Sequence, residues 1–76
     1  MKSLIEEVAK ALVDEPSTVS VNEIMGVTTS VYEISVSKDD IGKIIGKSGR
    51  TLLALRTIVA AVGTKLKRKA ILEVLE

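Results

Sequence analysis

The sequence predicts an α+β fold in which residues 1–76 form one domain, with a three-stranded mixed sheet and three helices on one face. Three observations predict it. The chain has 76 residues, enough for one small domain. Apolar residues alternate or recur at helical spacing in the order helix, strand, strand, short helix, helix, strand. Tyr32 is the only aromatic residue, so the core must consist of Val, Ile and Leu.

Residues 3–14 predict an amphipathic helix at the start of the chain. Ser3 followed by Glu6 fits a capping box at its beginning. Pro16 disfavours helical geometry at Glu15 and should end the helix. The residues that recur at helical spacing are Leu4, Ile5, Val8, Ala11 and Leu12.

Two strands joined by a short turn should follow. Residues 18–25 and 30–37 are rich in Val, Ile and Thr, and residues 26–29 between them have the length of a hairpin turn. Ile24 breaks the alternation of the first strand, which suggests a bulge there. In the second strand the residues expected on the buried face are Tyr32, Ile34 and Val36.

The second half of the chain should form two helices and a last strand. Asp39 and Asp40 suit the beginning of a short helix, where carboxylates meet the positive end of the helix dipole. A longer helix over residues 50–62 should end at Gly63, and residues 70–75 alternate as a strand. The first two strands should pair antiparallel, and the last should lie parallel to the second after a right-handed crossover. The apolar face of the short helix would consist of Ile41, Ile44 and Ile45.

The composition excludes several classes of function. The chain contains no Cys and no His, so it lacks thiolate and imidazole metal ligands and the usual general base at neutral pH. We therefore expect neither catalytic activity nor a metal or cofactor. No apolar run approaches the about 20 residues of a membrane span, and we expect a soluble, cytoplasmic protein.

Charge is divided unevenly along the chain. Residues 1–40 carry three basic and eight acidic side chains, whereas residues 41–76 carry eight basic and two acidic ones. This division can give the folded protein one positive face for a polyanion, although segregation of ordinary surface charges is an equal alternative.

The most informative segment is Gly46-Lys47-Ser48-Gly49, which lies between the two helical patterns of the second half. Glycine allows positive φ and a close approach of the backbone to a ligand. The loop leads into the beginning of the 50–62 helix, where free N–H groups favour phosphate. Lys47 adds a positive charge and Ser48 a hydroxyl donor, and Lys43 and Arg50 flank the loop.

With its two preceding isoleucines, this segment resembles the signature of the KH (K homology) family, two apolar residues followed by G-x-x-G. The order of elements is similar to the type II arrangement, and the run from Gly46 to Thr57 resembles the family of small bacterial stand-alone KH proteins called KhpA. The resemblance implies binding of single-stranded RNA, with the GXXG loop clamping about four nucleotides, and a role as RNA chaperone or post-transcriptional regulator. It also implies a second wall made of the last strand and the basic loop before it, residues 63–69. The expected RNA-binding residues are Lys43, Ile45, Gly46, Lys47, Ser48, Gly49, Arg50, Lys65, Lys67, Arg68 and Lys69.

A nucleotide-binding P-loop is an alternative that the sequence disfavours. Residues 42–48 spell G-x-x-x-G-K-S, one residue short of the required pattern. The preceding strand would also have to end directly at the loop, but Val36 lies well before it.

A protein-interaction module is the stronger alternative. In the 50–62 helix a wide apolar arc extends beyond the expected core stripe of Leu52, Leu55, Ile58, Val59 and Val62. We expect a dimer contact there, although one broad core face remains an alternative. The resemblance implies a homodimer, or a heterodimer with a KH protein of the Jag type. The expected contact residues are Ala54, Thr57, Ile58 and Ala61.

Overall fold

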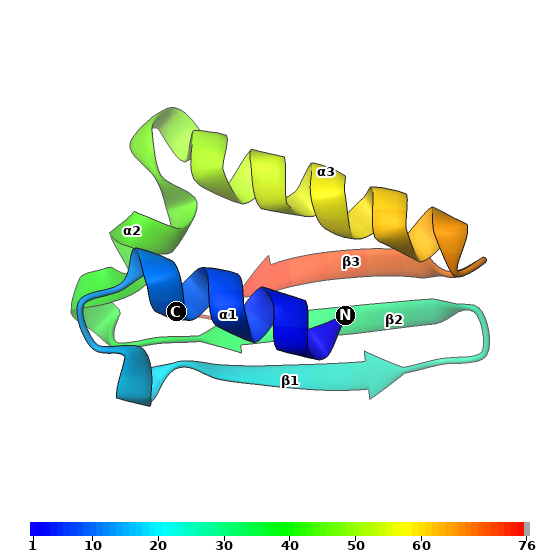
Figure 1. Cartoon of the computed structure of the whole chain (residues 1–76), viewed down its shortest axis with the longest axis horizontal. Coiled ribbons are helices and arrows are strands. Elements are labelled where there is room, and N and C mark those ends of the chain that lie inside the picture. Colours follow the sequence, from blue (N-terminus) through cyan, green and yellow to red (C-terminus); the bar gives the residue numbers. More distant parts are fainter. Residues whose placement is uncertain (76) are drawn as a thin grey trace.

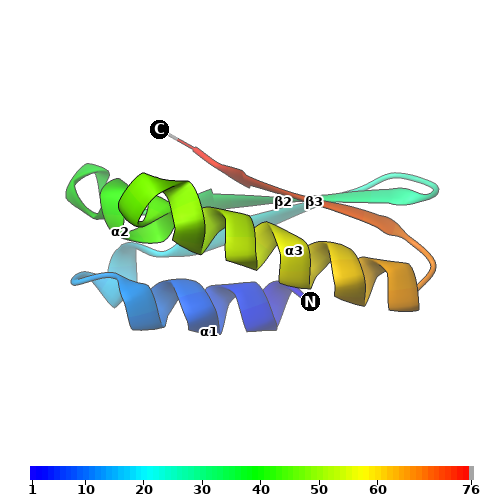
Figure 2. The same cartoon turned by 90° about the horizontal axis from the view of Figure 1, so that it is seen from above.

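The structure, a computed structural model, describes residues 1–75 and confirms the predicted α+β fold (Figure 1). The sheet has the strand order β1-β2-β3, with β1 antiparallel and β3 parallel to β2. All three helices lie on one face of the sheet, and its other face is open (Figure 2). The elements are α1 (Lys2–Leu12), β1 (Ser20–Met25), β2 (Thr29–Ser35), α2 (Ile41–Ile45), α3 (Arg50–Lys65) and β3 (Lys69–Val74).

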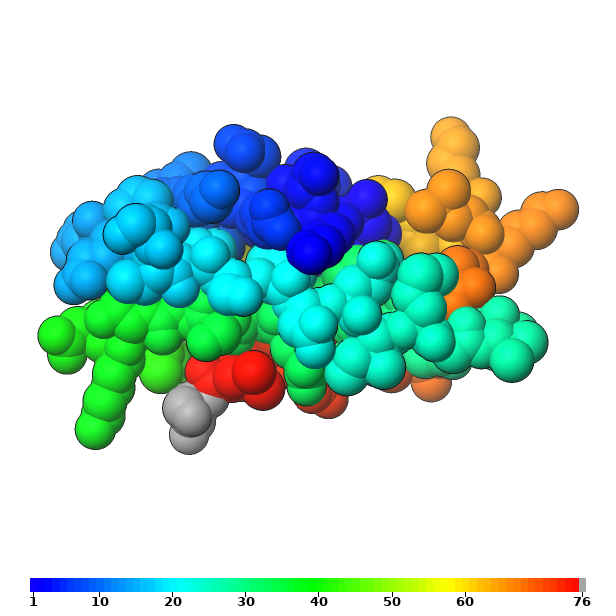
Figure 3. All heavy atoms as spheres, turned by 90° about the horizontal axis from the view of Figure 1, so that it is seen from below, coloured from blue at the N-terminus to red at the C-terminus, as the bar shows by residue number. Residues whose placement is uncertain are grey.

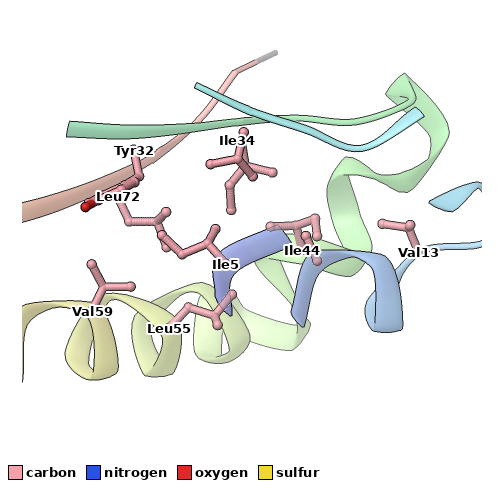
Figure 4. Close-up of a cluster of buried hydrophobic side chains, with 10 residues drawn as sticks. Ile5, Val13, Tyr32, Ile34, Ile44, Leu55, Val59 and Leu72 are labelled. Carbon is pink, nitrogen blue, oxygen red and sulfur yellow. The ribbon is translucent and has the colours of Figure 1, made fainter. Parts of the chain in front are cut away.

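The core lies between the sheet and the helices and is almost entirely aliphatic, as the composition requires (Figure 4). Ile34 of β2 and Ile44 of α2 are completely buried, and Leu72 and Val59 join the last strand to α3. Tyr32 points into the same cluster (Figure 4). No helix within residues 1–75 is both long enough and apolar enough to cross a bilayer.

The start and end of α1 differ from the prediction. The helix begins after Met1 without a side-chain capping bond, so the predicted capping box of Ser3 is wrong. The helix ends at Leu12 rather than next to Pro16, because the extended backbone at Val13 carries that side chain into the core. Pro16 instead begins a single 3₁₀ turn, where its missing N–H has no cost.

Asp40 connects the end of α1 to the beginning of α2. Its carboxylate accepts hydrogen bonds from the backbone N–H groups of Asp14 (3.3 Å) and Glu15 (3.1 Å) and from the ammonium group of Lys43 (3.3 Å). Burial opposes ionisation, but these three donors outweigh it and hold the pKa of Asp40 below its ordinary value. The sequence predicted helix capping here, whereas the carboxylate makes no capping bond to α2 and secures a distant segment.

Two other predictions about the strands and helices are wrong in detail. The β1–β2 register runs without interruption from Ser20↔Ser35 to Met25↔Ser30, so Ile24 causes no bulge and simply points to the open face. Gly63 does not end α3 but lies within it. A Cβ atom at Gly63 would lie 2.7 Å from the Cβ of Ala70, so the glycine allows α3 to pack closely on the start of β3.

Candidate nucleic-acid interface

The Gly46–Gly49 loop protrudes between α2 and α3 at one end of the molecule (Figure 1). Gly46 (φ 78°, ψ 174°), Ser48 (φ 56°) and Gly49 (φ 73°) all have positive φ. A side chain at Gly46 would also overlap the side chain of Thr51, so only glycine fits there. The side chains of Lys47 and Ser48 are exposed. The backbone therefore forms a compact turn that presents two polar side chains to solvent.

This turn leads directly into the first turn of α3. Gly49 is the residue before the helix. The N–H of Arg50 donates to the carbonyl oxygen of Lys47, and no side chain within residues 1–75 caps the N–H groups after it. These N–H groups lie at the positive end of a helix dipole, in the arrangement that binds phosphate in many proteins. With Lys47 and Arg50 both exposed beside them, the loop can hold an anionic backbone.

A shallow, mainly apolar hollow of about 660 Å³ lies beside α2. Ile41 and Ile45 line it, whereas Ile44 of the same helix is buried in the core. The structure thus separates the isoleucines that face solvent from the one that packs the fold. The complete lining is Val36, Lys38, Ile41, Gly42 and Ile45.

A second hollow lies between α3 and the free edge of β3. The backbone N–H groups of Lys69 and Leu75 donate to the carbonyl oxygens of Thr28 and Ile34 in the neighbouring part of the sheet. In a parallel pair alternate residues bond to the neighbouring strand, so the N–H and C=O groups of residues 70, 72 and 74 point away from β2. The carbonyl oxygen of Leu72 accepts a hydrogen bond from Nε of Arg56 (3.2 Å). The lining residues are Arg56, Ala60, Ala70, Ile71, Leu72 and Glu73.

Two cations of these hollows, Lys38 and Arg56, were absent from the sequence-based set. Nothing in the local sequence separated Lys38 from other surface lysines, because its position depends on how the segment before α2 folds against Val36. The sequence contained a weak indication for Arg56, because it lies on the helix that follows the GXXG loop, about two turns after the loop.

Lys43, in contrast, already forms ion pairs within the fold. Its ammonium group lies 2.7 Å from a carboxylate oxygen of Asp14 and 3.3 Å from one of Asp40, and these bonds raise its pKa above the ordinary value. At about 100° per residue, Lys43 lies about 160° around α2 from both Ile41 and Ile45, which line the hollow. The structure therefore places Lys43 on the side of α2 that faces the end of α1.

Arg68 is also engaged in the fold. Its guanidinium donates from Nε to the hydroxyl of Ser30 (2.9 Å), from Nη1 to the carbonyl oxygen of Val27 (3.1 Å), and from Nη2 to those of Gly26 (2.7 Å) and Thr29 (3.1 Å). Four acceptors from the β1–β2 hairpin therefore surround one side chain from the loop before β3. Arg68 therefore links the segment before β3 to the β1–β2 hairpin and stabilises the fold.

The basic loop predicted over residues 63–69 is shorter in the structure, because α3 continues to Lys65 and β3 begins at Lys69. The three remaining cations of this segment, Lys65, Lys67 and Lys69, are exposed. The segment that carries them lies next to the β1–β2 hairpin (Figure 3), at the end of the molecule opposite the GXXG loop (Figure 1). Since α3 has 16 residues that rise about 1.5 Å each, its two ends are about 24 Å apart. Within one chain the two expected basic regions do not meet.

The outer face of α3 carries the expected contact residues. Ala54, Thr57 and Ala61 are exposed, and Ile58 is 52% exposed, so its assignment to the core stripe is wrong. Leu53, which the sequence reasoning missed, is 64% exposed nearby. Most of this face packs against nothing within residues 1–75.

The chain is similar in sequence to a family of known proteins. The family model described as KhpA/KhpB, KH domain, matches residues 2–74. A relative named RNA-binding protein KhpA from Clostridium perfringens is 45% identical over 75 residues, which are 99% of this chain and 100% of the relative. Proteins of the same name from Chlamydia trachomatis and Aquifex aeolicus are 45% and 46% identical over all 76 residues, and these cover 97% and 96% of the relatives. No solved structure matches the chain significantly. Because the family model spans nearly the whole sequence and the relatives match along their full length, the chain belongs to the KhpA/KhpB KH-domain family.

Proposed function

We propose that this chain binds single-stranded RNA, with the Gly46–Gly49 loop holding the sugar-phosphate backbone. The observation that carries the proposal is the conformation of this loop. Positive φ at Gly46, Ser48 and Gly49 turns the chain sharply, so the exposed side chain of Lys47 lies in the turn that leads into the first turn of α3, where no side chain caps the N–H groups. The relatives named RNA-binding protein KhpA support the choice of RNA as the polyanion.

The two hollows give the strand a path on either side of the loop. Ile41 and Ile45 offer apolar surface to bases, and Lys38 and Arg56 add charge at the two ends of the path. Lys43 and Arg68 are excluded from the proposed RNA contacts because both are bound within the fold. The contacts proposed from the sequence-based set are therefore Ile45, Gly46, Lys47, Ser48, Gly49, Arg50, Lys65, Lys67 and Lys69.

This chain binds RNA weakly and with modest base selectivity. The only aromatic side chain, Tyr32, is 5% exposed, so no aromatic ring is available for stacking on bases. Discrimination then depends on backbone and base-edge hydrogen bonds. We expect dissociation constants in the micromolar range, which corresponds to about −8 kcal/mol.

The cellular role that fits such binding is that of an RNA chaperone or post-transcriptional regulator in the cytoplasm. Binding without catalysis is favoured because the chain has neither a histidine to activate a nucleophile nor a cysteine to act as one. Weak contacts at a single loop suit transient association with many RNAs.

A second proposed activity is self-association, or pairing with another KH-containing protein, through the outer face of α3. The exposed Leu53 and Ile58, next to the small side chains of Ala54 and Ala61, favour it. A second copy would add RNA contacts without any new chemistry, because linked sites raise the effective affinity.

The decisive experiment replaces Lys47 and Ser48 with Asp, which puts two negative charges where the phosphates should lie. Both side chains are exposed, so the fold should persist. The chain supplies a matched control, because Lys2 and Ser3 form the same dipeptide at the exposed start of α1. We expect the loop variant to lose RNA binding and the control variant with Asp at both positions to keep it. Equal affinities of the two variants would refute the proposal.

Salt dependence gives an independent measure of the phosphate contacts. For a single strand, the logarithm of affinity falls against the logarithm of salt concentration with a slope of about −0.7 per phosphate contacted. Three to five contacts would give slopes of about −2 to −3.5. A flat plot would show that the loop and its cations do not hold the backbone.

A further inference from the structure

The outward stripe of α3 has the same spacing read from either end. It consists of Arg50, Ala54, Thr57, Ile58, Ala61 and Lys65, and its midpoint falls between Thr57 and Ile58. A cation therefore occupies each end, an alanine lies four residues inside each cation, and the two larger residues flank the centre. All six side chains are exposed.

Such a stripe is complementary to a second copy of itself turned by a two-fold axis. In an isologous dimer with the axis at the midpoint, the two α3 helices run antiparallel and every position meets its counterpart in the other copy. Ala54 then faces Ala61 of the partner subunit, and these small side chains let the helices approach closely. Antiparallel packing also places the positive end of each helix dipole beside the negative end of the other, so the backbone dipoles of the two helices attract each other.

This geometry has a consequence for RNA binding. The GXXG loop and the basic loop lie about 24 Å apart within one chain, at opposite ends of α3. Helix axes pack about 8–10 Å apart and cross at about 20–50°, so in the antiparallel dimer the GXXG loop lies about 10–15 Å from the basic loop of the other copy. Each basic loop thus finds its nearest GXXG loop in the partner.

We propose that the RNA-binding cleft is composite, with Gly46–Gly49 and Arg50 from one copy and Lys65, Lys67 and Lys69 from the other. This inference rests on the proposed function and specifies the second copy as part of the site. A symmetric dimer then holds two identical clefts, one at each end of the paired helices.

The charges at each end of the stripe indicate what completes the cleft. Arg50 lies beside Lys65 of the partner subunit, and α3 contains no acidic residue that could neutralise the pair. Like charges at this distance repel, and a phosphate between them removes the repulsion. RNA binding and dimer formation are consequently linked, and each strengthens the other by the same factor.

Mixing two defective variants tests the composite cleft. One variant carries Lys47→Asp and Ser48→Asp, and the other carries Gln in place of Lys65, Lys67 and Lys69. The probe is a fluorescein-labelled oligouridylate of about twelve nucleotides, three times the length that one GXXG loop clamps. In a composite site, the mixed dimer contains one cleft with both intact halves. Random pairing makes half of the dimers mixed, so the mixture should regain about a quarter of the parent's binding capacity.

The outcomes separate the two proposals. If each variant alone binds poorly and the mixture regains capacity, the cleft is composite. If each binds poorly and the mixture gains nothing, the cleft lies within one chain and this inference is overturned while the proposed function stands. If the Lys47→Asp and Ser48→Asp variant still binds as the parent does, the proposed function itself fails.

Charge reversal at Lys65 tests the antiparallel arrangement without RNA. Lys65→Glu would face Arg50 of the partner subunit and turn two symmetry-related repulsions into two ion pairs. We expect dimerisation measured by sedimentation to tighten about tenfold at low salt, with Lys2→Glu as the control for the change in net charge. Unchanged or weaker association of Lys65→Glu, or monomers under all conditions, would overturn the arrangement.

Discussion

Arg68 offers a sharp test of the structure, because sequence reasoning and the structure assign it different tasks. A loop with four basic residues suggested four phosphate contacts, whereas in the structure the guanidinium holds the β1–β2 hairpin. Arg68→Gln removes that guanidinium and keeps a shorter polar side chain, which cannot reach the acceptors of Nη1 and Nη2. The substitution should lower stability and leave the RNA-binding loop at the far end unchanged.

The four bonds set the size of the effect. Those to Ser30 and Thr29 are partly buried, and bonds of this kind contribute about 1 kcal/mol each, with charge-assisted ones worth more. Those to Gly26 and Val27 are exposed and add less. We therefore expect a loss of about 2–3 kcal/mol, which for a domain of this size lowers Tm by about 10–20 °C. A 76-residue domain has only about 4–11 kcal/mol in total.

Urea unfolding followed by far-ultraviolet circular dichroism measures this loss. Lys67→Gln is the matched variant, because Lys67 belongs to the same loop, is exposed, and its side chain makes no hydrogen bond to the described residues 1–75. We expect Lys67→Gln to change stability by less than about 0.5 kcal/mol and to weaken RNA binding. Arg68→Gln should do the reverse. If Arg68→Gln unfolds at the same urea concentration as Lys67→Gln but loses RNA affinity, the structural role of Arg68 is refuted and its side chain contacts phosphate.

Three further outcomes follow from other parts of the structure. The folded chain holds the pKa of Asp40 below its ordinary value, so the ionised carboxylate stabilises the fold above about pH 4. This contribution to the free energy of unfolding is lost as the pH falls through the folded pKa, and urea unfolding of Asp40→Asn at different pH values should not show this loss. Gly46→Ala should lower the free energy of unfolding by at least about 1–2 kcal/mol and should abolish RNA binding. Gly42→Ala, whose added methyl group meets open space, should leave the free energy of unfolding in urea unchanged. Ile58→Asp should stay folded by circular dichroism, since Ile58 is half exposed, but sediment as a monomer; an unchanged mass distribution would exclude the α3 face.

The order and type of the elements could be predicted because they depend on local periodicity. Alternation in β2 placed Tyr32 and Ile34 in the core, and the short turn at residues 26–29 fixed the antiparallel pairing. Connection rules then sufficed to place the last strand parallel to β2. The GXXG loop was also predictable, since glycine readily adopts the positive φ angles found at Gly46 and Gly49, whereas the positive φ of Ser48 was not predicted.

The partners of individual charged residues could not be predicted, because they lie far away in the sequence. Arg68 binds acceptors 38–42 residues earlier, and Lys43 pairs with Asp14, 29 residues before it. A count of charges along the sequence treats such residues as if all of them were available to bind RNA. Their distribution over the folded surface shows that Lys47 and Arg50 are exposed, whereas Lys43 and Arg68 hold the structure together.

The helical wheel of α3 failed at Ile58 for a different reason. Alanines on the neighbouring positions widen the apolar arc, so periodicity alone did not show where the core face ends. The sheet covers only the arc centred on Leu55 and Val59, and this leaves Ile58 in solvent. The apparent excess of apolar residues is thus a separate outer face.

Titration of the ¹⁵N-labelled chain with single-stranded RNA, followed by amide chemical shifts, tests the central claim most directly. The largest shifts should fall on the amides of Lys47 to Thr51 and along the hollow beside α2, while Ile24 and Val31 on the open sheet face remain unchanged. Shifts concentrated on that open face, with the Gly46–Gly49 amides unaffected, would contradict the claim that this loop holds the phosphate backbone.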